Sequence, residues 1–90
     1  MAPLSDDEIQ KRLGTLQGWQ RVGDAIRKQY SFEGFRHSMD FVNRVAEQAE
    51  AMDHHPDILI EYSKVTLTLT SHDVGGLSGR DFKLAASIDS

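Results

Sequence analysis

The sequence predicts an α+β fold, in which a four-stranded antiparallel sheet carries helices packed on one face. A long apolar stripe at helical spacing fills the middle of the chain, and two pairs of short β-rich segments flank it. Capping patterns near the two ends predict one further helix at each. The expected element order is therefore α-β-β-α-β-β-α, which favours an antiparallel sheet with the helices on a single side.

A short helix is expected to follow Ser5. Ser5 and Glu8 form the pattern of a capping box, in which the hydroxyl accepts from the Glu8 amide and the Glu8 carboxylate reaches back. Apolar residues then share one helical face, at Ile9, Leu13 and Leu16. Gly14 weakens this helix, and we expect Gly18 to mark its end.

The first hairpin is expected to join residues 19–22 to residues 25–32. Gly23 and Asp24 lie between these segments, and this pair suits a type II′ turn. The second strand alternates between apolar and polar residues, as a half-buried strand does. Lys28 interrupts the alternation, which indicates an edge position or a twist at that point.

The central helix is expected to run from after Gly34 to about Met52. Its apolar stripe recurs at helical spacing, at Phe35, Met39, Val42, Ala46 and Ala49, and is broadened by Phe41, Val45 and Met52. Pro56 disfavours helical backbone at His55, so the helix should be finished by about Asp53 or His54.

The second hairpin is expected to join residues 57–62 to residues 64–70, with its turn near Ser63. Apolar residues of one parity, Val65, Leu67 and Leu69, give the last strand one buried face and one polar face. A glycine-containing loop follows. Ser78 and Asp81 then form a second capping-box pattern, which predicts a terminal helix through Phe82, Ala85, Ala86 and Ile88.

Composition excludes several classes of function. A chain of 90 residues with 39% hydrophobic and 27% charged residues is expected to form one domain over residues 1–90. The net charge of −4 argues against direct nucleic-acid binding. The lack of cysteine excludes disulfides, thiolate nucleophiles and cysteine-bound zinc. No signal peptide and no apolar run of ~20 residues is present, so no membrane association and a cytoplasmic location, or a nuclear one by diffusion, are expected.

Candidate functional residues cluster where the central helix must stop and a strand must begin. His54 and His55 lie there, flanked by Asp53 and Asp57. Side chains at such a corner can converge on a ligand without interrupting either element. We therefore expect function to reside at this corner.

A wider pattern carries a family resemblance. Residues 53–56 read Asp-His-His-Pro, residues 71–73 read Ser-His-Asp after a hairpin, and residues 75–78 read Gly-Gly-Leu-Ser before Asp81. Over nearly its whole length the chain resembles the pterin-4a-carbinolamine dehydratase family. The resemblance implies dehydration of a 4a-hydroxytetrahydropterin to the quinonoid dihydropterin, in tetrahydrobiopterin recycling, with no metal and no cofactor.

The resemblance also implies the site residues. The catalytic histidines map onto His54, His55 and His72. The substrate-binding residues map onto Glu50, Asp53, Ser71 and Asp81. Ser71 departs from the pattern, because the family usually has threonine there; the hydroxyl is kept and one methyl is lost.

The chemistry of this reaction suits histidine. The departing hydroxyl needs a proton, and a ring N–H must lose one as the C=N bond forms. Imidazole, with an unperturbed pKa of ~6.5, can perform either step, and carboxylates nearby favour its protonated form. We expect His54 to act on the ring proton and His72 on the hydroxyl, or the reverse. His55 would orient substrate or share the acid role.

Plainer interpretations exist for each residue. His54 could cap the helix dipole, and His55 could be a turn residue before proline. Asp81 could serve only to close its capping box, and Glu50 could be a solvated helix residue. A metal site is not expected, because adjacent side chains such as those of His54 and His55 diverge on extended backbone.

A second function, that of a protein-interaction module, follows from the central helix. A chain this small cannot be expected to cover the whole apolar stripe, and exposed apolar surface usually marks a partner. The resemblance implies that some relatives bind the dimerisation region of a homeodomain transcription factor and act as coactivators. We expect a homodimer or homotetramer, with Met39 and Val42 as candidate interface residues.

Overall fold

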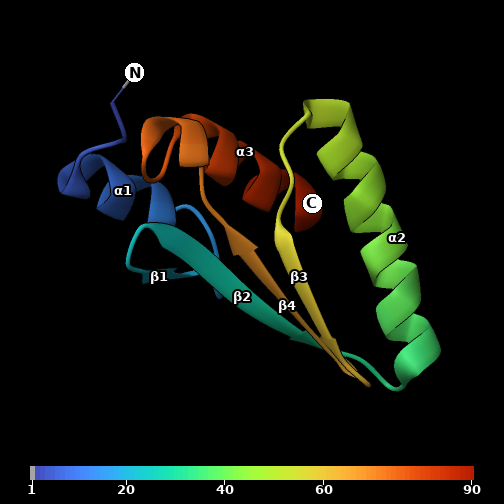
Figure 1. Ribbon diagram of the computed structural model, residues 1–90. Coiled ribbons are helices and arrows are strands. Elements are labelled where there is room, and N and C mark those ends of the chain that lie inside the picture. Colours follow the sequence, from blue (N-terminus) through green and yellow to red (C-terminus); the bar gives the residue numbers. More distant parts are fainter. Residues whose placement is uncertain (1) are drawn as a thin grey trace.

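A four-stranded antiparallel sheet organises the protein in the computed structural model, which describes residues 2–90 (Figure 1). The spatial order is β1-β2-β4-β3, so β2 and β4 are the inner strands. The strands are β1 (Gln20–Val22), β2 (Ala25–Ser31), β3 (Asp57–Glu61) and β4 (Lys64–Leu69). Neighbouring strands are antiparallel throughout.

Three helices pack on one face of this sheet, as predicted. They are α1 (Asp6–Leu13), α2 (Phe35–Met52) and α3 (Gly79–Ile88), and a 3₁₀ turn, η1 (His72–Val74), precedes α3. One buried cluster joins the three helices to the sheet through Ile9, Phe41, Val45, Leu84, Ile26, Leu67 and Leu69. The α+β fold and its element order α-β-β-α-β-β-α are therefore confirmed.

Both hairpins turn in two residues. In the first, Val22 pairs with Ala25, and only Gly23 of the two loop residues has a positive φ, of 62°. This is the pattern of the predicted type II′ turn. The second hairpin turns at Tyr62 and Ser63, which confirms the predicted turn near Ser63.

The first helix is shorter than predicted. It ends at Leu13, and Gly14 caps it, so the predicted end at Gly18 is wrong. The Ser5 hydroxyl accepts from the Glu8 amide at 3.2 Å as expected. The Glu8 carboxylate does not reach back; it accepts from Arg12 at 2.9 Å, because an ion pair one turn along the helix competes for it.

The face of α2 that meets the core also differs from the predicted one. The residues buried along α2 are Ser38, Phe41, Val45 and Ala49. Phe35 is 51% exposed and Ala46 is exposed, although both belong to the predicted stripe. The apolar arc of this helix is wider than the surface that the sheet and α3 cover, so part of the arc stays accessible to solvent. We call the part that carries Phe35 and Met39 the rim of α2.

Lys28 explains the interruption of the alternation in β2. Its side chain shares the inward parity of Ile26 and Tyr30, and its ammonium reaches the Asp89 carboxylate at 3.0 Å. The short strand β1 pairs with β2 only as far as Arg27. Lys28 therefore lies just beyond the end of β1, where a charged side chain can leave the core.

Candidate active site

The site begins where α2 stops. Asp53 adopts the left-handed conformation, with φ of 49°, and its amide donates to the Glu50 carbonyl at 3.3 Å. The His54 amide donates to the Ala49 carbonyl at 3.1 Å. This pair of hydrogen bonds is a Schellman motif, with an aspartate where glycine is usual. The reversal turns His54 back toward the molecule and confirms the predicted end of the helix.

His54 is bonded to Asp81 inside the protein. Its Nε2 lies 2.5 Å from Oδ1 of Asp81, and the histidine is only 8% exposed. Asp81 is fully buried, and its other oxygen accepts from the Ser71 hydroxyl at 2.8 Å and from the Ser78 amide at 2.9 Å. Each buried oxygen of the carboxylate thus has a donor, as burial of a charge requires.

Asp81 also starts α3. Ser78 and Asp81 form the predicted capping box, which holds the carboxylate at the helix N-terminus, where the helix dipole favours negative charge. The capping interpretation of Asp81 is therefore confirmed, and the same carboxylate is also the partner of His54. Its expected role in substrate binding stays a prediction. One carboxylate oxygen accepts hydrogen bonds at the N-terminus of α3, and the other bonds His54.

The second ring nitrogen of His54 is open to solvent. Its Nδ1 makes no hydrogen bond to residues 2–90, and no side-chain nitrogen or oxygen within that range is both buried and unpartnered. Nδ1 must therefore reach the surface. A carboxylate can only accept, so Nε2 carries the hydrogen toward Asp81 and Nδ1 presents a lone pair when the ring is neutral.

His55 forms a separate pair with Glu50. Its Nε2 lies 2.5 Å from the Glu50 carboxylate, and both side chains are exposed. Glu50 is thus not merely solvated. Asp53 makes no side-chain hydrogen bond to residues 2–90, and its observed role is to end α2.

His72 lies on the segment that follows β4. It is exposed at the start of η1 and lines a hollow of about 310 Å³ together with Asp24, Ala25, Thr70, Gly75 and Gly76. Its neighbour Ser71 bonds Asp81, so the segment that carries His72 is tied to His54 through one hydroxyl and one carboxylate.

Sequence reasoning missed Arg80. Its guanidinium bonds the Asp73 carboxylate at 2.6 Å, and this hydrogen bond holds the pKa of Asp73 below its usual value. A positive charge on nearby His54 lowers that pKa further. The ion pair therefore borders the site. Arg80 stands inside the capping-box sequence, but its partner lies across a loop, so no helical spacing points to it.

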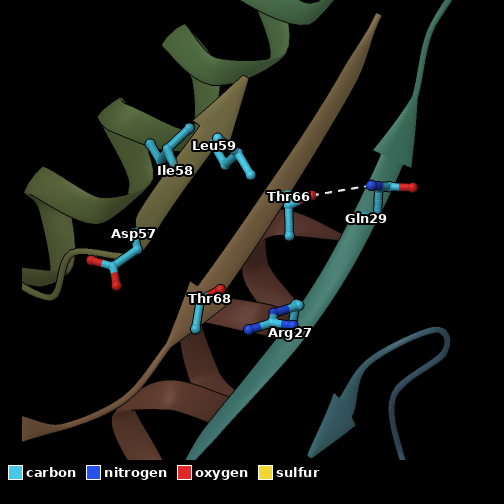
Figure 2. A pocket seen from close by; sticks show the side chains of 7 residues that line it. All are labelled: Arg27, Gln29, Asp57, Ile58, Leu59, Thr66 and Thr68. Atoms are coloured by element: carbon cyan, nitrogen blue, oxygen red, sulfur yellow. Dashed lines mark hydrogen bonds between the residues drawn. The ribbon is translucent and has the colours of Figure 1, made fainter. Parts of the chain in front are cut away.

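A larger hollow, of about 520 Å³, lies on the outer face of the sheet (Figure 2). Gln29 and Thr66 are joined there by a hydrogen bond of 3.3 Å, and Arg27 and Thr68 lie beside them. Asp57 also lines this hollow. None of the predicted site histidines does.

Within residues 2–90, no three histidine, cysteine, aspartate or glutamate side chains are arranged to hold a metal ion. None of the helices in the same range combines the length and the apolar character that crossing a membrane requires.

Comparison with known proteins identifies the family of this chain. The family model for pterin 4 alpha carbinolamine dehydratase matches residues 2–90. A protein of Koribacter versatilis, provisionally named a pterin-4-alpha-carbinolamine dehydratase, is 54% identical over 86 residues, which are 96% of this chain and 92% of that protein. A protein of Roseiflexus castenholzii with the same provisional name is 54% identical over 88 residues, or 98% and 95% of the two chains.

Solved structures give the same result. The crystal structure of a transcriptional coactivator/pterin dehydratase from Brucella melitensis superimposes with a TM-score of 0.92 at 32% identity, covering 97% of this chain and 95% of that one. A pterin dehydratase-like RuBisCO assembly factor of the α-carboxysome has a TM-score of 0.64 at 22% identity, over 79% and 82% of the chains, and shows the fold alone. The chain belongs to the pterin-4a-carbinolamine dehydratase family and is a hydro-lyase.

Proposed function

We propose that the protein removes water from a 4a-hydroxytetrahydropterin and yields the quinonoid dihydropterin, as a step of tetrahydrobiopterin recycling. The observation that carries this proposal is the buried hydrogen bond between His54 and Asp81, with Nδ1 of His54 open to solvent. A small site that must give and take protons near neutral pH needs an imidazole whose orientation is fixed.

His54 is the base in this proposal. Asp81 holds the proton on Nε2, so the Nδ1 lone pair is free to take the proton from the ring N–H of the substrate. The electron pair of that N–H bond then forms the C=N bond, and the bond between the ring carbon and the hydroxyl breaks. The hydrogen bond to Asp81 also stabilises the imidazolium that His54 becomes.

His72 is the acid in this proposal. It is exposed, it borders a hollow, and it lies on the segment joined to Asp81 by Ser71. It would give its proton to the departing hydroxyl, which leaves as water. The proton gained by His54 and the proton lost by His72 balance over one turnover, since each exchanges with solvent.

His55, Glu50 and Asp53 are proposed to contact substrate. The pair of His55 and Glu50 lies at the mouth of the helix-to-strand corner, where it can orient the pterin or share the acid role. Asp53 presents a free carboxylate beside it. The reaction is proposed to need neither a metal nor an organic cofactor.

The test is a coupled assay in which a pterin-dependent hydroxylase generates the 4a-hydroxypterin and its disappearance is followed. We expect His54→Ala and His72→Ala each to lower kcat/KM by about 10²-fold or more, the usual contribution of a general acid or base. His37→Ala is the matched control, because His37 is an exposed histidine on α2 outside the site. Near-normal turnover in both site variants would end the assignment.

A second function, assembly and partner binding, is favoured by the rim of α2. Phe35 is 51% exposed, and it lines a hollow of about 240 Å³ with Arg36, Met39, Asp40 and Asn43. We propose that this rim joins copies of the chain into a homodimer or homotetramer, and a transcription-factor partner would use the same face. We do not propose direct nucleic-acid binding. We propose a cytoplasmic location.

Sedimentation equilibrium on Met39→Glu tests this face. We expect a smaller assembly than in the unmodified protein, because a charge on the apolar rim opposes its burial. Glu47→Gln, an exposed change on the same helix, should leave the assembly as it was. An unchanged mass for Met39→Glu would exclude the rim as the interface.

A further inference from the structure

Pro3 and Leu4 lie against the loop that carries His72. We call residues 2–4 the N-terminal arm and residues 72–77 the His72 loop. The Leu4 amide donates to the Leu77 carbonyl at 2.8 Å, and Leu4 packs against the core. Figure 1 shows the arm, in dark blue, descending beside the orange turn before α3.

Pro3 occupies the space that a side chain at position 76 would need. A Cβ placed on Gly76 would lie 2.9 Å from Cβ of Pro3 and 3.5 Å from its Cγ. Real Cβ atoms do not approach this closely. Gly76 is not in the left-handed region of φ, unlike Gly75 at 75°. The absence of a side chain at position 76 is therefore required by Pro3 and not by the backbone conformation.

Gly76 is in turn the backbone partner of Ser71. The Ser71 amide donates to the Gly76 carbonyl at 2.9 Å, and the Gly76 amide donates to the Ser71 carbonyl at 3.3 Å. This isolated bridge closes the base of the His72 loop. Ser71 then donates through its hydroxyl to Asp81, which bonds His54. Four contacts thus connect Pro3 to the imidazole of His54.

We infer that the N-terminal arm is a positioning element of the active site, and that Pro3 acts through its packing on Gly76. The arm fixes the Ser71–Gly76 bridge, and the bridge places the Ser71 hydroxyl toward Asp81 and the His72 ring toward the substrate. Pro3 touches no substrate and is a positioning residue only. The inference rests on the proposed function, since it assigns the loop its catalytic task.

A double-mutant cycle tests the contact. Gly76→Ala adds a methyl group that must displace Pro3, and we expect kcat to fall about tenfold, because a shift of ~1 Å in a catalytic group is costly. Pro3→Gly removes the packing and should lower kcat by a few-fold. The double variant Pro3→Gly/Gly76→Ala should recover most of the activity lost in Gly76→Ala, since the methyl group then fills the vacated space.

Two controls separate positioning from a loss of folded protein. Gly34→Ala makes the same change where the nearest atom is 4.0 Å away, and it should leave kcat unchanged. The pH profile of kcat/KM should shift in Gly76→Ala and return in the double variant. A variant that is merely less stable has fewer active molecules with an unchanged profile.

The outcomes are distinct. Activity that falls in Gly76→Ala, with a shifted pH profile, and returns with Pro3→Gly supports the inference. Normal kcat in Gly76→Ala, or a fall that Pro3→Gly does not correct, overturns it. If Gly76→Ala does not fold, Pro3→Gly alone decides by the same kcat and pH profile. Lack of dehydratase activity in the unmodified protein would instead overturn the proposed function.

Discussion

Asp81 joins a structural duty to a chemical one within a single side chain. Two donors, the Ser71 hydroxyl and the Ser78 amide, converge on its Oδ2, and only Oδ1 faces His54. Each carboxylate oxygen therefore has a defined task. The consequence is that a change from carboxylate to amide has a predictable orientation.

Asp81→Asn should invert the tautomer of His54. The two donors will hold the amide oxygen at the Oδ2 position, so the NH₂ group must face Nε2 of His54 and donate to it. The ring proton then moves to Nδ1, and the lone pair that takes the substrate proton is lost. We expect kcat to fall by about 10²-fold or more, with ring ¹⁵N chemical shifts reporting the inverted tautomer.

Asp73→Asn is the matched control for Asp81→Asn. It also converts a carboxylate near His54 to an amide, but Asp73 is exposed and bonds Arg80. Its kcat should stay within a few-fold of normal. If Asp81→Asn kept full activity with the tautomer inverted, His54 would not be the base.

The sequence indicated candidate site residues, but it did not indicate the contacts between them. His54, His55, His72, Glu50 and Asp81 are visible in the sequence as acid–base groups near a helix end or a capping box. Which carboxylate meets which histidine depends on the path of the loop after β4, and no sequence spacing encodes that path. The pairing of Arg80 with Asp73 was missed for the same reason.

At the scale of elements, the C-terminal end of α3 is held by its cap residue. The Asp89 carboxylate accepts from Trp19 Nε1 at 2.8 Å, from Lys28 Nζ at 3.0 Å and from the Tyr30 hydroxyl at 2.5 Å. These donors come from the segment before β1 and from β2. One carboxylate thus fastens α3 to the first hairpin.

Asp89→Asn should destabilise the fold. A neutral amide cannot accept three hydrogen bonds equally well, and it leaves the ammonium of the partly buried Lys28 side chain without its counter-charge. We expect a loss of about 1–3 kcal/mol in the free energy of unfolding, measured by urea titration with Trp19 fluorescence. Asp40→Asn, at an exposed position of α2, should change that free energy by less than ~0.5 kcal/mol.

The hydrogen bonds around Asp89 also make the stability of the fold depend on pH. Burial opposes ionisation of Asp89, but hydrogen bonds from Tyr30, Lys28 and Trp19 outweigh it and hold the pKa of Asp89 below its usual value. Because the folded pKa is lowered, its stabilising contribution is present above the unfolded value of ~3.9 and is lost as pH falls through the folded one. The difference in stability between Asp89→Asn and the unmodified protein should therefore shrink in acid.

At alkaline pH, stability changes with pH in the opposite direction. Burial, aided by the hydrogen bond to Asp89 and its charge, raises the pKa of Tyr30 above its usual value of ~10. The contribution of Tyr30 to stability is therefore fully present below pH ~10, and it is lost as the pH rises above that value. Tyr30→Phe should remove this alkaline loss of stability, and an unchanged alkaline limb would argue against the cluster.

Local signals in the sequence predicted the elements well, and competition between partners produced the errors. The first hairpin and the capping box at Ser78 are encoded by a few adjacent residues, and both were correct. The Glu8 carboxylate could bond either the Ser5 amide or the Arg12 guanidinium, and it bonds Arg12. On α2 the apolar arc is wider than one face, so sequence could not decide that Val45 is buried and Phe35 is exposed.

At the scale of the whole molecule, the predicted catalytic residues and the apolar rim lie on different parts of one chain. The molecule measures 39 × 23 × 21 Å along its principal axes. The predicted site surrounds the end of α2 and the start of α3, whereas Phe35 and Met39 lie near the beginning of α2. Assembly and chemistry should therefore be separable.

Met39→Glu should lose assembly before it loses activity. Every proposed site residue comes from one chain, so we expect kcat to remain within about twofold once the protein is confirmed to be folded. The coupled assay at the protein concentration used for sedimentation checks this. A parallel loss of mass and of turnover would mean that a second copy completes the site.

The two ends of α3 are fastened by two aspartates, and each reports on a different property. Asp81 in the first turn of α3 orients His54. Unwinding of that turn would therefore release the imidazole and abolish turnover. Asp89 past the last turn holds the indole of Trp19, so fluorescence registers release of the opposite end. Turnover and emission, followed together in mild urea, would show which end of the helix opens first.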